Sequence, residues 1–380
     1  MSEFSQFVEL VQSVYSSRDF IALHEPRFLG DERKFVNEAI DSTFVSSVGK
    51  FVDQFEIELA KYTSTKRAAA TVNGTSALQV ALRIAGVRTG DEVITQALTF
   101  VATANSISYN SAQPVFIDVD SDTMGMSPLA LTNFLDEYGD LREDGTYNKL
   151  SGRRIGAILP MHTFGFMCRI EEIVKISMDW KIPVVEDAAE SLGSFYREGA
   201  AGSFGMMGAF SFNGNKLITA GGGGAIVSRE EAHAAKAKYL TNTAKVPHAW
   251  DYYHDEIGYN FRMPNINAAL ALGQLRQIEK FIESKKEVFQ LYRKSIEHFS
   301  FNLKDIPLDT KWNYWLICLE LSDEEERNEF LKSTNELGVM TRPIWKLMFD
   351  LPMYESCQRD EQKNAIVLSK TIVNIPSSVR

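Results

Sequence analysis

A single lysine, Lys216, lies between an apolar run and four consecutive glycines in the stretch SFNGNKLITAGGGG. A lysine amine becomes a nucleophile toward carbonyl groups when it is desolvated or placed beside another positive charge. The glycines, Gly221 to Gly224, would remove side chains that crowd a cavity around such an amine. Taken alone, the same stretch also fits an exposed lysine on a glycine turn.

A second apolar run delivers Glu186 and Asp187 to its end, in IPVVEDAAESLG. Open α/β sheets bind ligands at the carboxyl ends of their strands, so Asp187 and Lys216 could reach one cavity at that edge. An aspartate at this position could cap a helix, bind a metal, or hold a proton on the nitrogen of a ring.

The stretch VNGTSALQVAL predicts a strand that ends at Asn73 and Gly74, and a helix that begins at Thr75 or Ser76. A helix N-terminus has free N–H groups and favours anions, and a glycine lets a phosphate approach the backbone. The stretch therefore fits a phosphate-binding cup. The alternative is that Thr75 or Ser76 only caps the helix.

These three features occur together in one chain, and each is weak alone. Pyridoxal 5′-phosphate needs a phosphate anchor, a carboxylate that keeps its ring nitrogen protonated, and a lysine that forms a Schiff base. The cup, Asp187 and Lys216 supply one candidate for each. We therefore expect this cofactor and no metal.

The elements that would position these residues alternate between strand and helix patterns from about residue 55. Nearly continuous apolar strands separated by amphipathic segments predict a mostly parallel sheet covered by helices on both faces. After about residue 250 the pattern changes to a long helical stretch, a strand and another helix. We expect a large domain over residues 1–245 and a smaller α+β domain over residues 246–380.

Composition excludes several classes of protein. The net charge of -10 and the isoelectric point near 5.3 argue against a nucleic-acid partner. Three widely spaced cysteines, Cys168, Cys318 and Cys357, suggest neither a disulfide framework nor a metal site. No long apolar stretch predicts a membrane span or an export signal. We expect a cytoplasmic enzyme that does not associate with membranes.

Four blocks, NGTSAL, EDAAESLG, GAFSFNGNK with its glycines, and IGYNFRMPNINAALALGQL, resemble the DegT/DnrJ/EryC1/StrS family over about residues 20–376. The resemblance implies a fold-type I pyridoxal phosphate enzyme with a seven-stranded mixed sheet. It also implies a homodimer with shared active sites. The stretch LHEPRFLGDERKFVNEAIDSTFVSSVGKFVDQFE is most similar to C4 aminotransferases of legionaminic acid-type pathways.

The resemblance assigns roles by matching positions. Lys216 matches the Schiff-base lysine, Asp187 matches the partner of the ring nitrogen, and Phe100 matches the aromatic residue that stacks on the ring. The remaining cofactor positions are Gly74, Thr75, Ser76 and Ser211 at the phosphate, Glu190 near the ring hydroxyl, where the family usually has His or Gln, and Asn260, which reaches the phosphate of the neighbouring subunit.

The activity implied by the resemblance is transfer of an amino group from L-glutamate to a nucleotide-linked keto-sugar. The expected acceptor is a UDP-linked 4-keto-6-deoxyhexosamine used for surface-glycan or nonulosonic acid biosynthesis. A C3 aminotransferase acting on dTDP- or GDP-linked sugars, a sugar dehydratase and a non-catalytic binding protein are alternatives. The related dehydratases replace the lysine with histidine, so Lys216 favours transamination.

Two further residues are candidates for substrate contacts. His162, in LPMHTFG, is expected at a strand end that faces the cleft, although a packed or solvated histidine fits the sequence equally well. Arg262 could pair with a diphosphate through its forked donors or form a surface salt bridge. The aromatic residues Trp250, Tyr252 and Tyr253 could stack on a base or, as we favour, line a dimer interface.

Overall fold

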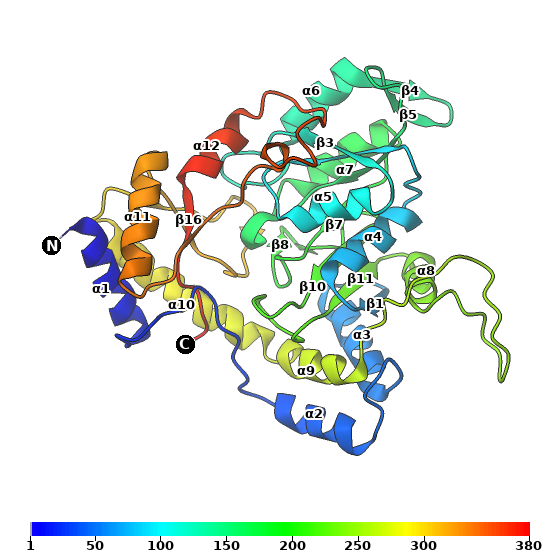
Figure 1. Cartoon of the computed structure of the whole chain (residues 1–380), viewed down its shortest axis with the longest axis horizontal. Helices are drawn as coiled ribbons and strands as arrows, with labels where there is room; N and C mark the ends of the chain where they lie inside the picture. Colours follow the sequence, from blue (N-terminus) through cyan, green and yellow to red (C-terminus); the bar gives the residue numbers. More distant parts are fainter. Residues whose placement is uncertain (1) are drawn as a thin grey trace.

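The computed structural model of the chain describes residues 2–380 (Figure 1). Its central sheet has seven strands. Two hydrogen-bonded sheets, β1-β11-β10-β7 and β3-β2-β6, are joined by parallel bridges from Ile158 to Val184 and from Met161 to Asp187. Only β11 runs antiparallel to its neighbours. The strands are β1 (Arg67–Thr71), β2 (Glu92–Gln96), β3 (Gln113–Ile117), β6 (Ile155–Leu159), β7 (Val185–Asp187), β10 (Met207–Ser211) and β11 (Gly224–Ser228).

Both faces of this sheet are buried, which explains the continuous apolar strands. Successive side chains of a strand point to opposite faces. Val93 and Ile94 of β2 accordingly belong to two different hydrophobic clusters. The cluster around Val93 packs under α4 (Gly74–Ile84) and α8 (Glu231–Thr241), and the cluster around Ile94 packs under α3 (Lys50–Tyr62), α6 (Pro128–Tyr138), α7 (Ile170–Asp179) and α9 (Asn265–Leu275). The fold-type I α/β architecture is therefore confirmed.

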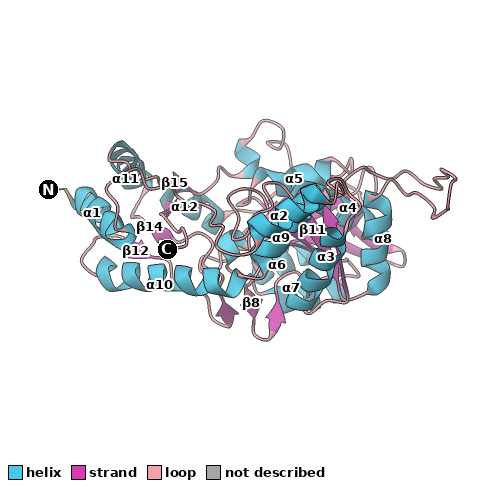
Figure 2. Ribbon diagram, turned by 90° about the horizontal axis from the view of Figure 1, so that it is seen from below, coloured by secondary structure: helices cyan, strands magenta, loops and turns pink. Residues whose placement is uncertain are grey.

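A second unit contains an antiparallel four-stranded sheet of order β12-β14-β16-β15. Its elements are β12 (Asn302–Leu303), β14 (Cys318–Glu320), β15 (Arg342–Pro343), β16 (Ile372–Asn374), α10 (Ile278–Ile296), α11 (Glu324–Glu336) and α12 (Lys363–Thr371). The N-terminal helix α1 (Glu3–Tyr15) packs here, with the Phe7 ring 5.1 Å from that of Phe330. Figures 1 and 2 show α1 beside α10 and α11. The proposed division at residues 245 and 246 stays a prediction.

The remaining elements are short or peripheral. They are α2 (Glu32–Asp41), α5 (Val101–Ser108), the hairpin of β4 (Gly139–Arg142) and β5 (Gly145–Asn148), the small sheet of β8 (Phe195–Tyr196), β9 (Gly199–Ala200) and β13 (Thr310–Lys311), and two 3-10 turns, Thr163–Gly165 and Met348–Asp350. Between α8 and α9 the chain forms an arm that leaves the body of the molecule (Figures 1 and 2). Within residues 2–380, none of the helices has the length and apolar character needed to cross a membrane.

Candidate active site

Asp187 lies at the end of one strand of the central sheet, and Lys216 lies in the turn that follows the neighbouring strand. Asp187 is the last residue of β7, and Ala209, its parallel partner in β10, lies two residues before the end of that strand. Lys216 follows in the turn after β10, with its N–H bonded to the carbonyl of Asn213 at 3.1 Å. The structure therefore brings these two sites to the same edge of the sheet, as the sequence predicted.

The Lys216 side chain points into the protein and not into bulk solvent. Its Nζ donates to Glu190 Oε1 at 3.1 Å, and the two side chains are 13% and 2% exposed. The same Nζ lies 4.1 Å from the centre of the Trp315 ring. Burial raises the pKa of Glu190, and the positive charge of Lys216 acts in the opposite direction. Of the two interpretations of Lys216, the exposed loop residue is therefore wrong.

Asp187 is a buried carboxylate, 2% exposed. Its Oδ2 accepts from the Thr103 hydroxyl at 2.7 Å, and its Oδ1 accepts from the N–H of Ala189 at 3.1 Å. Burial raises the pKa of Asp187, and the hydrogen bond from Thr103 offsets part of this increase. A buried carboxylate of this kind is stabilised by a cation placed against it, such as a protonated ring nitrogen.

The helix-capping interpretation of Asp187 is wrong. No helix begins at residues 188–198, so Asp187 does not cap one. Among the described residues, no group of three or more His, Cys, Asp or Glu side chains is arranged to hold a metal ion.

The predicted cup is present at the start of α4, but the cap differs from the expectation. The helix begins at Gly74, and the side chain of Asn73 accepts from the N–H of Ser76 at 2.7 Å. Asn73 is therefore the cap, and the interpretation of Thr75 or Ser76 as the capping residue is wrong. The first-turn N–H groups of Gly74 and Thr75 have no acceptor within the helix and remain able to bind an anion.

Gly74 and Ser211 lie against each other. A Cβ atom added at Gly74 would lie 2.8 Å from the Cβ and 3.2 Å from the Oγ of Ser211. Gly224 also lies close to the start of α4, since a Cβ atom added at Gly224 would lie 2.7 Å from the backbone nitrogen of Gly74. The absence of a side chain at Gly224 thus allows β11 to pack against the cup. This explains one of the four consecutive glycines, and it was not predicted from the sequence. The close approach of α4, β10 and β11 fits a phosphate held by backbone groups and one hydroxyl.

We expect Gly74→Ala to weaken binding of pyridoxal phosphate by about tenfold or more. The added methyl group would displace Ser211 or the first turn of α4, and each 1.4 kcal/mol lost changes a dissociation constant tenfold. Titration of the cofactor by absorbance measures the change. Gly222→Ala is the control, because an added Cβ there meets no atom within 4 Å. Equal affinity of the Gly74→Ala variant and the wild type would place the phosphate elsewhere.

Phe100 lies beside the Asp187 network and remains accessible. It occupies the N-cap of α5, its carbonyl accepts from the N–H of Thr103 at 3.1 Å, and its side chain is 49% exposed. Its ring is 6.3 Å from that of Trp345. A half-exposed aromatic face next to the buried aspartate is compatible with the predicted stacking on a planar ring.

The expectation that His162 faces the cleft is wrong. Its side chain is fully buried, with Nε2 3.1 Å from Glu186 Oε2 and Nδ1 accepting from the N–H of Cys168 at 3.3 Å. Glu186 also accepts from the N–H groups of Gly202, Phe204 and Gly205 at 2.7 to 2.9 Å. His162 and Glu186 therefore hold a loop to the sheet. The packed histidine that the sequence also allowed is the one observed.

Asn260 and Arg262 lie at the base of the arm between α8 and α9. Arg262 Nε donates to Asn260 Oδ1 at 3.0 Å, and its Nη1 donates to Asn242 Oδ1 at 3.2 Å. Asn260 is exposed, and the hydrogen bonds of Arg262 go to Asn260 and Asn242, not to Asp187. Their predicted roles remain proposals. The surface salt bridge considered for Arg262 is replaced by two amide hydrogen bonds.

Several residues of the site were not predicted from the sequence. Trp315 and Trp345 come from the second unit, and their rings pack against Phe164 at 6.3 and 4.9 Å. Thr103 orients Asp187, and the N–H of Phe164 donates to Glu190 Oε2 at 2.9 Å. The three aromatic residues in KWNYW, residues 311–315, were the one feature of the sequence that could have indicated an aromatic wall. It gave no indication of which face the rings would cover.

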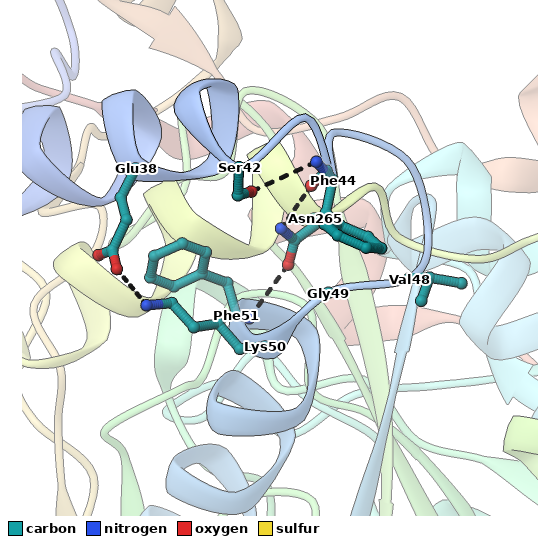
Figure 3. A pocket seen from close by; sticks show the side chains of 8 residues that line it. All are labelled: Glu38, Ser42, Phe44, Val48, Gly49, Lys50, Phe51 and Asn265. Carbon is teal, nitrogen blue, oxygen red and sulfur yellow. Dashed lines mark hydrogen bonds and ion pairs between the residues drawn. The ribbon is translucent and has the colours of Figure 1, made fainter.

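A separate pocket of about 310 Å³ lies between α2, the start of α3 and the start of α9 (Figure 3). Asn265 joins its walls by accepting from the N–H of Phe51 at 3.0 Å and donating to the carbonyl of Phe44 at 2.6 Å. None of the predicted site residues lines this pocket, and exposed Phe44 and Val48 border it. It is therefore distinct from the site around Lys216.

Known proteins resemble this chain over nearly its whole length. The DegT/DnrJ/EryC1/StrS aminotransferase family model matches residues 28–380. EpsN of Bacillus subtilis, named provisionally as a pyridoxal phosphate-dependent aminotransferase, is 37% identical over 88% of this chain and 84% of its own. GDP-perosamine synthase of Escherichia coli O157:H7 is 35% identical over 94% of this chain and 93% of its own.

Among solved structures, the Helicobacter pylori aminotransferase PseC, involved in pseudoaminic acid biosynthesis, superposes with a TM-score of 0.85 at 24% identity, covering 94% of each chain. At this identity the likeness establishes the fold alone. The narrower resemblance to legionaminic acid-type enzymes stays a prediction. The family match over residues 28–380 and the two sequence relatives establish more: the chain is a pyridoxal phosphate-dependent aminotransferase of the DegT/DnrJ/EryC1/StrS family.

Proposed function

We propose that this enzyme transfers an amino group from L-glutamate to the keto group of a nucleotide-linked sugar, for the biosynthesis of a surface glycan or nonulosonic acid. The observation that carries the proposal is the 35% identity to GDP-perosamine synthase over 94% of the chain, together with a buried lysine and aspartate at one sheet edge. The preferred acceptor is a UDP-linked 4-keto-6-deoxyhexosamine, aminated at C4, because the stretch LHEPRFLGDERKFVNEAIDSTFVSSVGKFVDQFE is similar to C4 aminotransferases of legionaminic acid-type pathways.

Each residue of the proposed site would have a separate role in the reaction. The cofactor, when bound, would supply a carrier for the amino group and an electron sink for the carbon that loses its proton. Lys216 would hold the cofactor and then serve, through Nζ, as the base and acid of the 1,3-proton shift, taking the proton from the donor carbon that bears the amino group and returning a proton on the cofactor side of the nitrogen. Asp187 would hold a proton on the ring nitrogen, which keeps the ring electron-poor. Gly74, Thr75, Ser76 and Ser211 would bind the phosphate.

The surroundings of Lys216 suit a proton transfer that must avoid water. Glu190 and Trp315 border its Nζ, and Trp345 and Phe164 extend the aromatic wall toward Phe100. Exclusion of water strengthens the electrostatic effect of each charged group in such a site. Glu190 stands where we expect the ring hydroxyl, so it would share a proton with that oxygen.

We further propose that the active enzyme is a homodimer. The arm between α8 and α9 carries Trp250, Tyr252 and Ile257, which are 82%, 78% and 77% exposed. Large apolar side chains gathered on a projecting segment are typical of an interface. Asn260 lies exposed at the base of this arm and could reach the phosphate of the neighbouring subunit. A monomer by light scattering, active at every concentration, would contradict this arrangement.

A substrate panel tests the function. We expect purified enzyme with glutamate to aminate a UDP-4-keto-6-deoxy-N-acetylhexosamine and to release 2-oxoglutarate in equal amount, measured by mass spectrometry. A GDP-linked keto-sugar is the second candidate, because the relatives include GDP-perosamine synthases; dTDP-linked and 3-keto sugars complete the panel. Product formed without 2-oxoglutarate would indicate a dehydratase. No cofactor uptake at all would indicate a binding protein.

A further inference from the structure

The head group of Lys216 occupies a small site with two walls of different chemistry. One wall is the Glu190 carboxylate, whose Oε1 lies 3.1 Å from Nζ, and the other is the Trp315 ring, whose centre lies 4.1 Å from Nζ. A carboxylate and the face of an indole both attract an ammonium group. Glu190 and Trp315 are only 4% and 3% exposed, so water competes weakly for these contacts.

The two walls are fixed by contacts that do not involve Lys216. The second oxygen of Glu190 accepts from the N–H of Phe164 at 2.9 Å. The indole N–H of Trp315 donates to the carbonyl of Asn215 at 2.8 Å. Phe164 itself is held at φ 55°, a conformation that non-glycine residues rarely adopt. The site is therefore preorganised, since neither wall depends on the lysine for its position.

Asn313 connects the walls to each other. Its Nδ2 donates to the carbonyl of Glu190 at 2.8 Å, and its Oδ1 accepts from the N–H of Trp315 at 3.0 Å. Glu190 follows β7 of the central sheet, whereas Asn313 and Trp315 precede β14 of the second unit. The site is thus assembled across the two units, and it exists only while they are packed together.

We propose that Glu190 and Trp315 form a rest site for the Lys216 ammonium, occupied whenever the lysine is not bonded to the cofactor. The inference rests on the proposed function, because each transfer of an amino group requires the lysine to leave the cofactor and return. The rest site keeps the released head group beside the reacting atoms and out of solvent. Trp315 acts as a positioning residue, through Lys216 and not through the substrate.

Chemical labelling of the free lysine tests this proposal. Full-length enzyme is converted to its aminated cofactor form with excess glutamate and no acceptor, and is then treated with cyanate, which is small and modifies free amines. Mass spectrometry of the peptide that contains Lys216 gives the labelling rate. We expect Trp315→Leu and Glu190→Gln to label about threefold to tenfold faster than the wild type, and Trp315→Phe to be intermediate.

Two controls separate attraction from access. Glu190→Gln keeps the size of the side chain, so faster labelling in this variant cannot come from a wider opening. Trp345→Leu removes a ring of the same wall that packs against Phe100 and Phe164, so it tests access alone, and we expect it to accelerate labelling less than Trp315→Leu does. If circular dichroism shows that Trp315→Leu does not fold, Trp315→Phe and Glu190→Gln decide the question.

Unchanged labelling in Glu190→Gln and in the folded Trp315 variants would overturn the rest site. Equal acceleration in Trp345→Leu would also overturn it, because access alone would then explain the effect. Failure of glutamate to convert the cofactor is a separate result that counts against the proposed function. In that case the same labelling on the full chain without cofactor still tests the rest site, because the contacts of Lys216 with Glu190 and Trp315 involve protein groups alone.

Discussion

Replacing Lys216 by alanine is expected to reduce kcat by at least about 10³-fold and to abolish the visible absorbance of covalently bound cofactor. The variant loses both the amine that holds the cofactor and the group that moves the proton, and acid–base catalysis alone contributes about 10²- to 10⁴-fold. Steady-state kinetics with glutamate and the best acceptor of the panel measure the first effect. The absorbance spectrum of the purified variant measures the second.

The control for this variant is Lys175→Ala, an exposed lysine of α7. We expect it to keep wild-type turnover and spectrum. Lys216→Ala leaves Glu190 buried without its ion pair, but the pKa of Glu190 is already raised by burial, so this carboxyl can take up a proton. We therefore expect the variant to fold. Full turnover by folded Lys216→Ala would remove Lys216 from the chemistry.

Replacing Asp187 by asparagine is expected to lower kcat by about 10³-fold while the cofactor still binds. Asparagine has nearly the same shape as aspartate and keeps an acceptor for the Thr103 hydroxyl, but it cannot hold a proton on a ring nitrogen by its charge. Preorganised charges at an active site typically contribute about 10²- to 10³-fold each. Single-turnover conversion with glutamate isolates this step from acceptor binding.

The neighbouring carboxylate provides a matched comparison. Glu186 precedes Asp187 in β7 and therefore points to the opposite face of the sheet, where it accepts from three backbone N–H groups and contacts His162. We expect Glu186→Gln to lower the free energy of unfolding by about 2–3 kcal/mol with little change in kcat, because it weakens charge-assisted hydrogen bonds. Chemical denaturation and kinetics of both variants distinguish the two roles. If Glu186→Gln lowered kcat and Asp187→Asn lowered only stability, Glu186 would be the catalytic carboxylate and Asp187 the structural one.

The sequence by itself determined the fold class and the residues that meet at the sheet edge. Continuous apolar strands alternating with amphipathic segments are a local pattern, and in a parallel sheet they place all strand ends on one side. Asp187, Lys216 and Gly74 could therefore be brought together without coordinates, and the family resemblance added Ser211. The same reasoning failed for His162, because a position near a strand end does not reveal whether the side chain turns toward the cleft or into the core.

Only the tertiary structure decided what surrounds the lysine. Trp315 and Trp345 lie about 100 residues or more after Lys216 in the chain, and no periodicity relates them to the strand that precedes it. The Trp315 segment is held at the site because Trp312 and Asn313 bond to the backbone carbonyls of Phe164 and Glu190, whereas the Trp345 ring packs against Phe100 and Phe164. Contacts of this kind depend on how two units pack, which is set by the shape of both surfaces and not by the pattern of either segment.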